Sequence, residues 1–96
     1  MFEYHCWAMA EPEGGIEAED ALARGLEARI AELEDAARES FNVSRLNALT
    51  VTASGLRNRY QGAVPSVFEW LARECPQAYG LIYHRGDDLG GDGLYR

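Results

Sequence analysis

The chain has 96 residues, of which 47% are hydrophobic and 26% are charged. This composition is typical of one globular domain and excludes a disordered chain, a collagen-like repeat and a disulfide-rich scaffold. The 16 acidic and 9 basic residues give a net charge of -7, and every basic residue is an arginine. Because phosphate backbones are bound by clustered cations, this charge speaks against a nucleic-acid ligand and favours a basic partner.

Targeting and redox signals are weak. No apolar run approaches the roughly 18 residues that a membrane helix requires. Residues 8–10 match the small-residue pattern of a cleavage site, but nothing basic precedes them, and Glu3 and His5 interrupt the apolar segment. We therefore expect no signal peptide and a cytoplasmic protein. Under those conditions Cys6 and Cys75 are expected to be buried, reduced thiols.

Residues 2–10 predict the first strand, because large side chains alternate between two faces. These faces are Phe2, Tyr4, Cys6 and Ala8 on one side, and Glu3, His5, Trp7 and Met9 on the other. Since both faces carry large groups, we expect a central strand rather than an edge strand. Residues 11–15 contain a proline and two glycines, which should end it.

Residues 16–38 predict one amphipathic helix with an acidic polar face. Its apolar stripe consists of Leu22, Leu26, Ile30, Leu33 and Ala37. Residues 11–39 hold ten acidic residues and three arginines, a sum of -7, whereas the rest of the chain sums to zero. The net charge of the protein is therefore expected on this helix and its lead-in, either as a solvated surface or as a binding surface.

Residues 41–46 and 49–54 predict a hairpin, with Asn47 available for the backbone angles of the turn. In its second strand, Thr50, Thr52 and Ser54 alternate with apolar residues, so one face of the sheet should be open to solvent. Residues 55–62 show no sustained period and predict a loop.

The last third of the chain predicts a helix and a strand. Pro65 suits the first turn of a helix that ends before Pro76. Its apolar stripe consists of Val64, Val67, Phe68, Leu71 and Cys75. Residues 79–85 predict a strand, residues 86–93 an acidic turn, and residues 94–96 the start of a further strand. The order is that of an α+β, ferredoxin-like sandwich, βαββαβ, with two helices on one face of a mainly antiparallel sheet.

We find no catalytic, metal or cofactor motif. The Cys and His residues lack the spacing of a zinc site, and His5 and Cys6 should point to opposite faces of a strand. The acidic turn lacks the ligand pattern of a calcium loop, and neither cysteine has a setting that activates a nucleophile. The sequence therefore predicts no enzyme, no metal and no cofactor.

Aromatic residues are the remaining signal, because Tyr and Trp often anchor protein interfaces. We expect Trp7 and Trp70 to be core or half-core residues of the small sheet. Tyr83, followed by His84, Arg85 and acidic residues, is the better candidate for a surface anchor.

Several segments in order resemble the immunity protein 7 family. They are residues 2–7, 54–59, 68–71 and 76–83 and the pair Asp87 and Asp88. The chain departs from that family at Cys6, where the family usually has Gly, and at Arg59, where it favours His. The family also continues into a final strand after the acidic turn, so the resemblance raises the prospect of a truncated member.

The resemblance implies a small cytoplasmic protein of bacterial polymorphic toxin or contact-dependent inhibition systems. Such a protein binds and neutralises one cognate toxin domain, often a nuclease. An acidic helix surface suits the cationic substrate site of a nuclease. The contact residues that we predict lie on the acidic helix and around the last strand and turn: Glu27, Glu34, Asp35, Tyr83, Arg85, Asp87 and Asp88.

Two other classes of function remain open. A ferredoxin-like module that binds a small ligand or regulates through its open sheet face is the main alternative, and a ligand-induced rise in melting temperature would favour it. An enzyme would need a convergent cleft, and turnover of a substrate would reveal it. Mimicry of DNA by the acidic helix would require charges spaced like phosphates.

Overall fold

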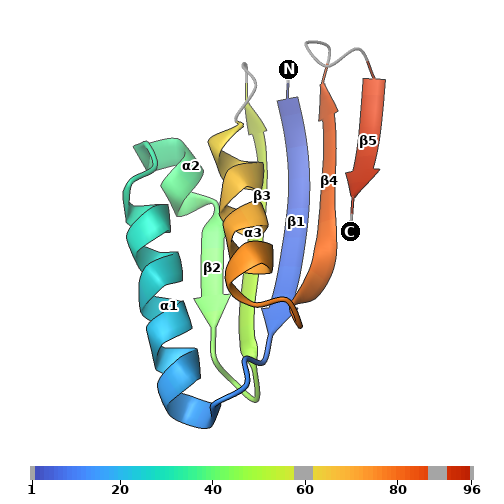
Figure 1. Ribbon diagram of the computed structural model, residues 1–96. Helices are drawn as coiled ribbons and strands as arrows, with labels where there is room; N and C mark the ends of the chain where they lie inside the picture. Colours follow the sequence, from blue (N-terminus) through green and yellow to red (C-terminus); the bar gives the residue numbers. More distant parts are fainter. Residues whose placement is uncertain (1, 58–61, 87–90, 96) are drawn as a thin grey trace.

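The computed structural model of the chain describes residues 2–57, 62–86 and 91–95, and side chains within residues 3–56 and 62–85. Its elements follow the order β1 (Phe2–Ala10), α1 (Gly15–Ala31), α2 (Asp35–Glu39), β2 (Phe41–Ser44), β3 (Leu49–Arg57), α3 (Ala63–Glu74), β4 (Tyr79–Gly86) and β5 (Gly91–Tyr95). Figure 1 shows the strands side by side in one sheet, with the helices on one side of it.

The sheet is antiparallel throughout and has the strand order β2-β3-β1-β4-β5. This arrangement confirms the predicted α+β, ferredoxin-like sandwich. The first strand is central, as its two faces of large groups indicated, and pairs with β3 and β4. The predicted turn 86–93 is wrong at both ends, because β4 continues to Gly86 and β5 already begins at Gly91; the expected stub is the end of β5, which extends the sheet beyond β4.

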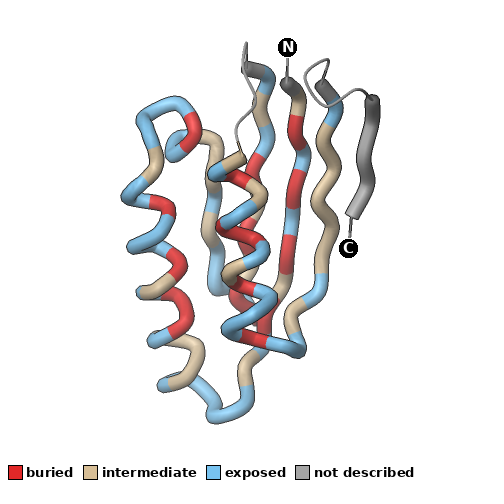
Figure 2. The backbone as a smooth tube through the Cα atoms, turned by 45° about the horizontal axis from the view of Figure 1, so that its top comes forward, coloured by how far each residue is buried: buried red, intermediate tan, exposed pale blue. Residues whose placement is uncertain are grey.

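The core lies between the helices and one face of the sheet. Buried and exposed residues alternate along β1 (Figure 2), as the pleat of a strand facing a core on one side requires. Tyr4, Leu26 and Val64 are each fully buried in this core, one from β1 and one from each long helix. The predicted apolar stripes of both helices are therefore confirmed.

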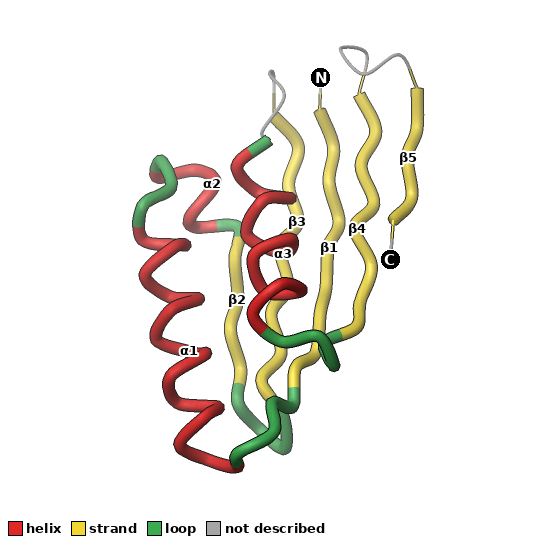
Figure 3. Tube along the Cα trace, viewed as in Figure 1, coloured by secondary structure: helices red, strands yellow, loops and turns green. Residues whose placement is uncertain are grey.

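The predicted helix 16–38 is wrong in its continuity, because the chain breaks into α1 and α2 (Figure 3). Glu34 has an extended backbone, with φ -67° and ψ 158°, so the chain changes direction between the two helices. An unbroken helix of that length would span about 35 Å, against about 30 Å for a nine-residue strand. The break keeps the chain over the sheet and lets Ala37, which is 1% exposed, join the core.

The hairpin is confirmed, and its turn uses Asn47 at φ 71°. The predicted loop 55–62 is wrong at its beginning, because β3 continues to Arg57 and pairs with β1 as far as Phe2. Tertiary packing explains this extension. A Cβ on Gly55 would lie 2.6 Å from the hydroxyl of the buried Tyr4, so the glycine makes room for that ring within the strand.

Candidate functional site

The face of the sheet that points away from the helices carries the most distinctive chemistry of the molecule. Register places His5 opposite Tyr83, Trp7 opposite Leu81 and Met9 opposite Tyr79. Because alternate residues of paired strands share a face, these side chains lie together. We call the group formed by His5, Trp7, Tyr79, Leu81 and Tyr83 the aromatic face.

Ring contacts organise the aromatic face into two pairs. Trp7 and Tyr79 meet edge to face with ring centroids 6.0 Å apart, and the Tyr79 hydroxyl lies 3.4 Å from the Met9 sulfur. His5 and Tyr83 stack with their centroids 6.0 Å apart. Glu3 accepts a hydrogen bond from His5 at 2.8 Å. The rings are thus held in place by their neighbours before any partner binds.

The rings are nevertheless open to solvent. Trp7 is 40% exposed and Tyr79 is 62% exposed, although both are large apolar side chains. On the helical side of the sheet, a separate cleft of about 170 Å³ lies between α3 and β4 and is lined by apolar residues such as Leu71 and Ala78. An exposed apolar patch with rigid aromatic rings is typical of a protein-binding surface.

The charge of the aromatic face is close to balanced among the described residues. Glu3 lies opposite Arg85 in the register of β1 and β4. On the neighbouring strand, Thr52 and Ser54 lie opposite Trp7 and His5 and add hydroxyl groups to the same face. The arrangement can therefore hold a partner by apolar and hydrogen-bonding contacts, without the desolvation of many charges.

Three of the acidic residues predicted for contact lie on or beside the helices, on the other side of the sheet. Glu27 is exposed on α1, Glu34 is exposed before α2, and Asp35 is exposed in the first turn of α2. Arg38 forms an ion pair with Asp35 at 2.5 Å, which neutralises part of this charge. We define the acidic helix surface by its exposed carboxylates, which are Glu17, Glu27, Glu32, Glu34, Asp35 and Glu39.

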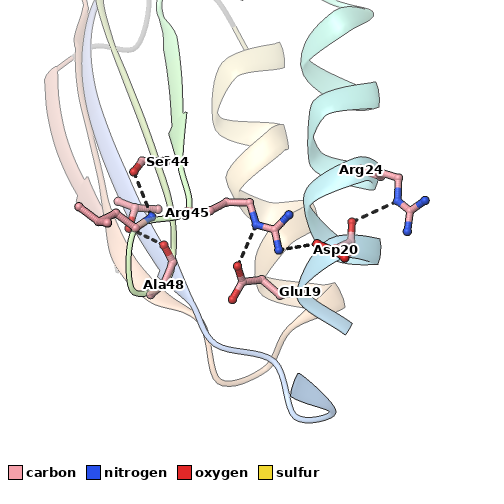
Figure 4. Close-up of polar contacts among 8 residues, drawn as sticks. Glu19, Asp20, Arg24, Ser44, Arg45 and Ala48 are labelled. Atoms are coloured by element: carbon pink, nitrogen blue, oxygen red, sulfur yellow. Dashed lines mark hydrogen bonds and ion pairs between the residues drawn. The ribbon is translucent and has the colours of Figure 1, made fainter. Parts of the chain in front are cut away.

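Two further acidic residues of α1 serve the fold. Arg45, at the turn of the β2–β3 hairpin, reaches Glu19 at 2.8 Å and Asp20 at 2.5 Å (Figure 4). Both carboxylates raise the pKa of Arg45, so its charge is fixed. These contacts join the hairpin to the start of α1. Because Glu19 and Asp20 already pair with Arg45, they are less available to bind a partner.

The structure thus separates the predicted contact residues. Tyr83 and Arg85 lie on the open side of the sheet, whereas Glu27, Glu34 and Asp35 lie on the helical side. The predicted contacts Asp87 and Asp88 lie outside the described residues. One rigid partner surface cannot cover both sides of the sheet, so the two groups must be tested as separate surfaces.

Sequence reasoning missed Trp7 and Tyr79 as surface residues. The expectation of a core or half-core position is confirmed for Trp70, which packs against the core, but it is wrong for Trp7. The signal was present in the alternation of the first strand, which puts Trp7 on the face opposite Tyr4. The alternation alone does not indicate which of the two faces the helices cover.

The cysteines are buried in the core and unpaired with each other. Burial raises the pKa of the Cys6 thiol to about 11, so this sulfur stays protonated near neutral pH and is a poor nucleophile. Within the described residues, no three His, Cys, Asp or Glu side chains gather as they would around a metal ion.

Cys6 should make the stability of the protein fall at alkaline pH. The unfolded chain loses this proton from about its ordinary pKa of 9.0, whereas the folded chain keeps it to about 11, so unfolding becomes more favourable as pH rises between these values. We expect this group to lower the free energy of unfolding by up to about 1.4 kcal/mol per pH unit there. Urea titrations of the wild type and of Cys6→Ala check this, and parallel pH profiles for the two proteins would contradict it.

None of the helices in the described part of the chain is long and apolar enough to cross a membrane. No family model matches the chain, and neither a curated protein nor a solved structure matches it. The resemblance to the immunity protein 7 family therefore stays a prediction that rests on the quoted residues.

Proposed function

We propose that this protein is an immunity protein, which binds one bacterial toxin domain and neutralises it inside the cytoplasm of the producing cell. The observation that carries the proposal is the aromatic face, where Trp7 and Tyr79 lie exposed on the open side of the sheet. The family resemblance supplies the class of partner, and the surface chemistry supports binding as the mode of action. On this proposal the protein acts without catalysis and without a cofactor.

The acidic helix surface and the aromatic face have different roles in this proposal. The acidic helix surface provides a long-range field that attracts a basic toxin, such as a nuclease, and raises the rate of association. The aromatic face provides the short-range contacts, since a few buried aromatic anchors carry most of the free energy of binding at an interface. Salt should therefore slow association and leave dissociation almost unchanged.

Co-expression with the toxin domain encoded immediately upstream in the genome tests the proposal. We expect survival of the co-expressing cells and a complex that survives purification. Cells that die although the full-length chain is present and folded would contradict immunity. Equal survival without this chain would show that the neighbouring protein is no toxin.

A module that binds a small ligand is the second candidate, and the apolar cleft between α3 and β4 is the observation that favours it. Its volume of about 170 Å³ is small beside the roughly 300–1,000 Å³ of most ligand pockets. A metabolite that raises the melting temperature of the isolated chain would support this alternative.

A further inference from the structure

A groove on the helical side of the molecule combines an aromatic wall with a negative rim. It has a volume of about 330 Å³ and lies between the start of α1 and the end of α3. Its apolar walls include Leu22 and Trp70, and among the described residues that line it the charged ones are Glu13 and Glu74. Both carboxylates are exposed, so a partner can reach them.

The position of Glu74 strengthens the negative potential of the groove. It is the last residue of α3, where the unpaired carbonyl groups carry the negative end of the helix dipole. A carboxylate at that end is unfavourable for the helix itself. Arg73, which precedes it, is not among the residues that line the groove. A cation that enters the groove therefore meets two carboxylates and the negative end of a helix.

Trp70 already shows that its ring accepts a cation in this fold. The guanidinium carbon of Arg29 lies 5.0 Å from the centre of the ring, within the range of a cation–π contact. Gly25 allows this packing, because a Cβ there would lie 2.8 Å from the edge of the ring. The indole is thus held between α1 and α3 while part of it stays open to solvent.

We propose that this groove binds a protruding arginine or lysine side chain of a partner protein, whose alkyl stem packs on Leu22 and Trp70 and whose charge pairs with Glu13 and Glu74. Charge complementarity selects a cation, and the apolar walls select a long side chain over a free metal ion. The site goes beyond the proposed function, because it lies on the opposite side of the sheet from the aromatic face.

Titration with a capped tripeptide, acetyl-Gly-Arg-Gly-amide, tests the site without any toxin, so the site and the immunity function can fail separately. The chain has two tryptophans, and their indole N–H signals in a nitrogen-15 NMR spectrum serve as probe and internal control. We expect a saturable shift of the Trp70 signal and none of the Trp7 signal. A Trp7→Phe variant assigns the two signals.

Two matched variants separate the groove from the general acidity of the protein. Glu13→Gln/Glu74→Gln should weaken peptide binding at least about fivefold. Glu11→Gln/Glu17→Gln removes the same charge from residues outside the groove and should change binding less than about twofold. An equal loss in both variants, an unmoved Trp70 signal, or an equal shift with Gln in place of the peptide's Arg would overturn the proposal.

Discussion

Gly80→Ala should lower the free energy of unfolding by about 3 kcal/mol, which corresponds to a fall of about 15 °C in the melting temperature of a domain of this size. A Cβ at this position would lie 2.1 Å from the Trp7 carbonyl oxygen and 2.7 Å from the Ala8 Cα. Both atoms belong to the backbone of the central strand, so no side chain can rotate to relieve the overlap. The strands β1 and β4 must move apart.

Gly25→Ala is the matched control for this effect. There the new methyl group meets only the far edge of the Trp70 ring, and alanine gains about 1 kcal/mol of helix propensity over glycine. We expect its free energy of unfolding to lie within about 1 kcal/mol of the wild type. Urea denaturation followed by circular dichroism measures both variants, and an equal loss in the two would contradict the close approach of β1 and β4.

Trp7→Ala/Tyr79→Ala should weaken binding of the toxin domain at least about 30-fold, because truncation of two central aromatic anchors costs about 2 kcal/mol or more. The two rings support each other at 6.0 Å and lie on the open face of the sheet. Isothermal titration calorimetry with the purified toxin domain measures the change. Stability should suffer less, because both side chains are already exposed in the free protein.

A matched control removes exposed apolar area elsewhere. Ile16 is 69% exposed at the start of α1, and Leu46 is 81% exposed in the β2–β3 turn. Ile16→Ala/Leu46→Ala should leave the affinity within about threefold of the wild type. If this control loses as much affinity as Trp7→Ala/Tyr79→Ala, the aromatic face is not the binding surface.

Periodicity predicted the elements well wherever one face of an element is apolar. The stripe from Leu22 to Ala37 and the alternation from Leu49 to Ala53 both point into the core. Periodicity could not predict the break at Glu34, since the stripe continues across it with the same spacing. That break depends on the length of the sheet beneath the helix, which is a property of the folded molecule.

The candidate site was harder to predict than the fold. In β1, both faces carry large side chains, and burial is decided by where the helices pack. Tyr4 therefore became core and Trp7 became surface, although each ring fits either environment. Tyr83 was predicted as a surface anchor; it lies half-buried on the open side of the sheet, and its neighbours Trp7 and Tyr79 come together only through strand register.

The long-range ion pairs also could not be predicted from the sequence. Arg45 lies 26 residues from Glu19, and their contact of 2.8 Å depends on the hairpin turning toward the start of α1. From the sequence, Glu19 and Asp20 were counted among the acidic residues of a negatively charged helix. The structure assigns both to a contact within the fold, so neither belongs to the acidic helix surface.

The most direct test of the central claim follows the two tryptophans during partner binding. The chain is labelled with 5-fluorotryptophan, which gives one fluorine NMR signal each for Trp7 and Trp70, and the toxin domain is left unlabelled. When the complex forms, the Trp7 signal should move and lose its sensitivity to exchange of water for heavy water, because the ring leaves solvent. A stable complex in which Trp7 stays as solvent-sensitive as in the free protein would contradict binding through the aromatic face.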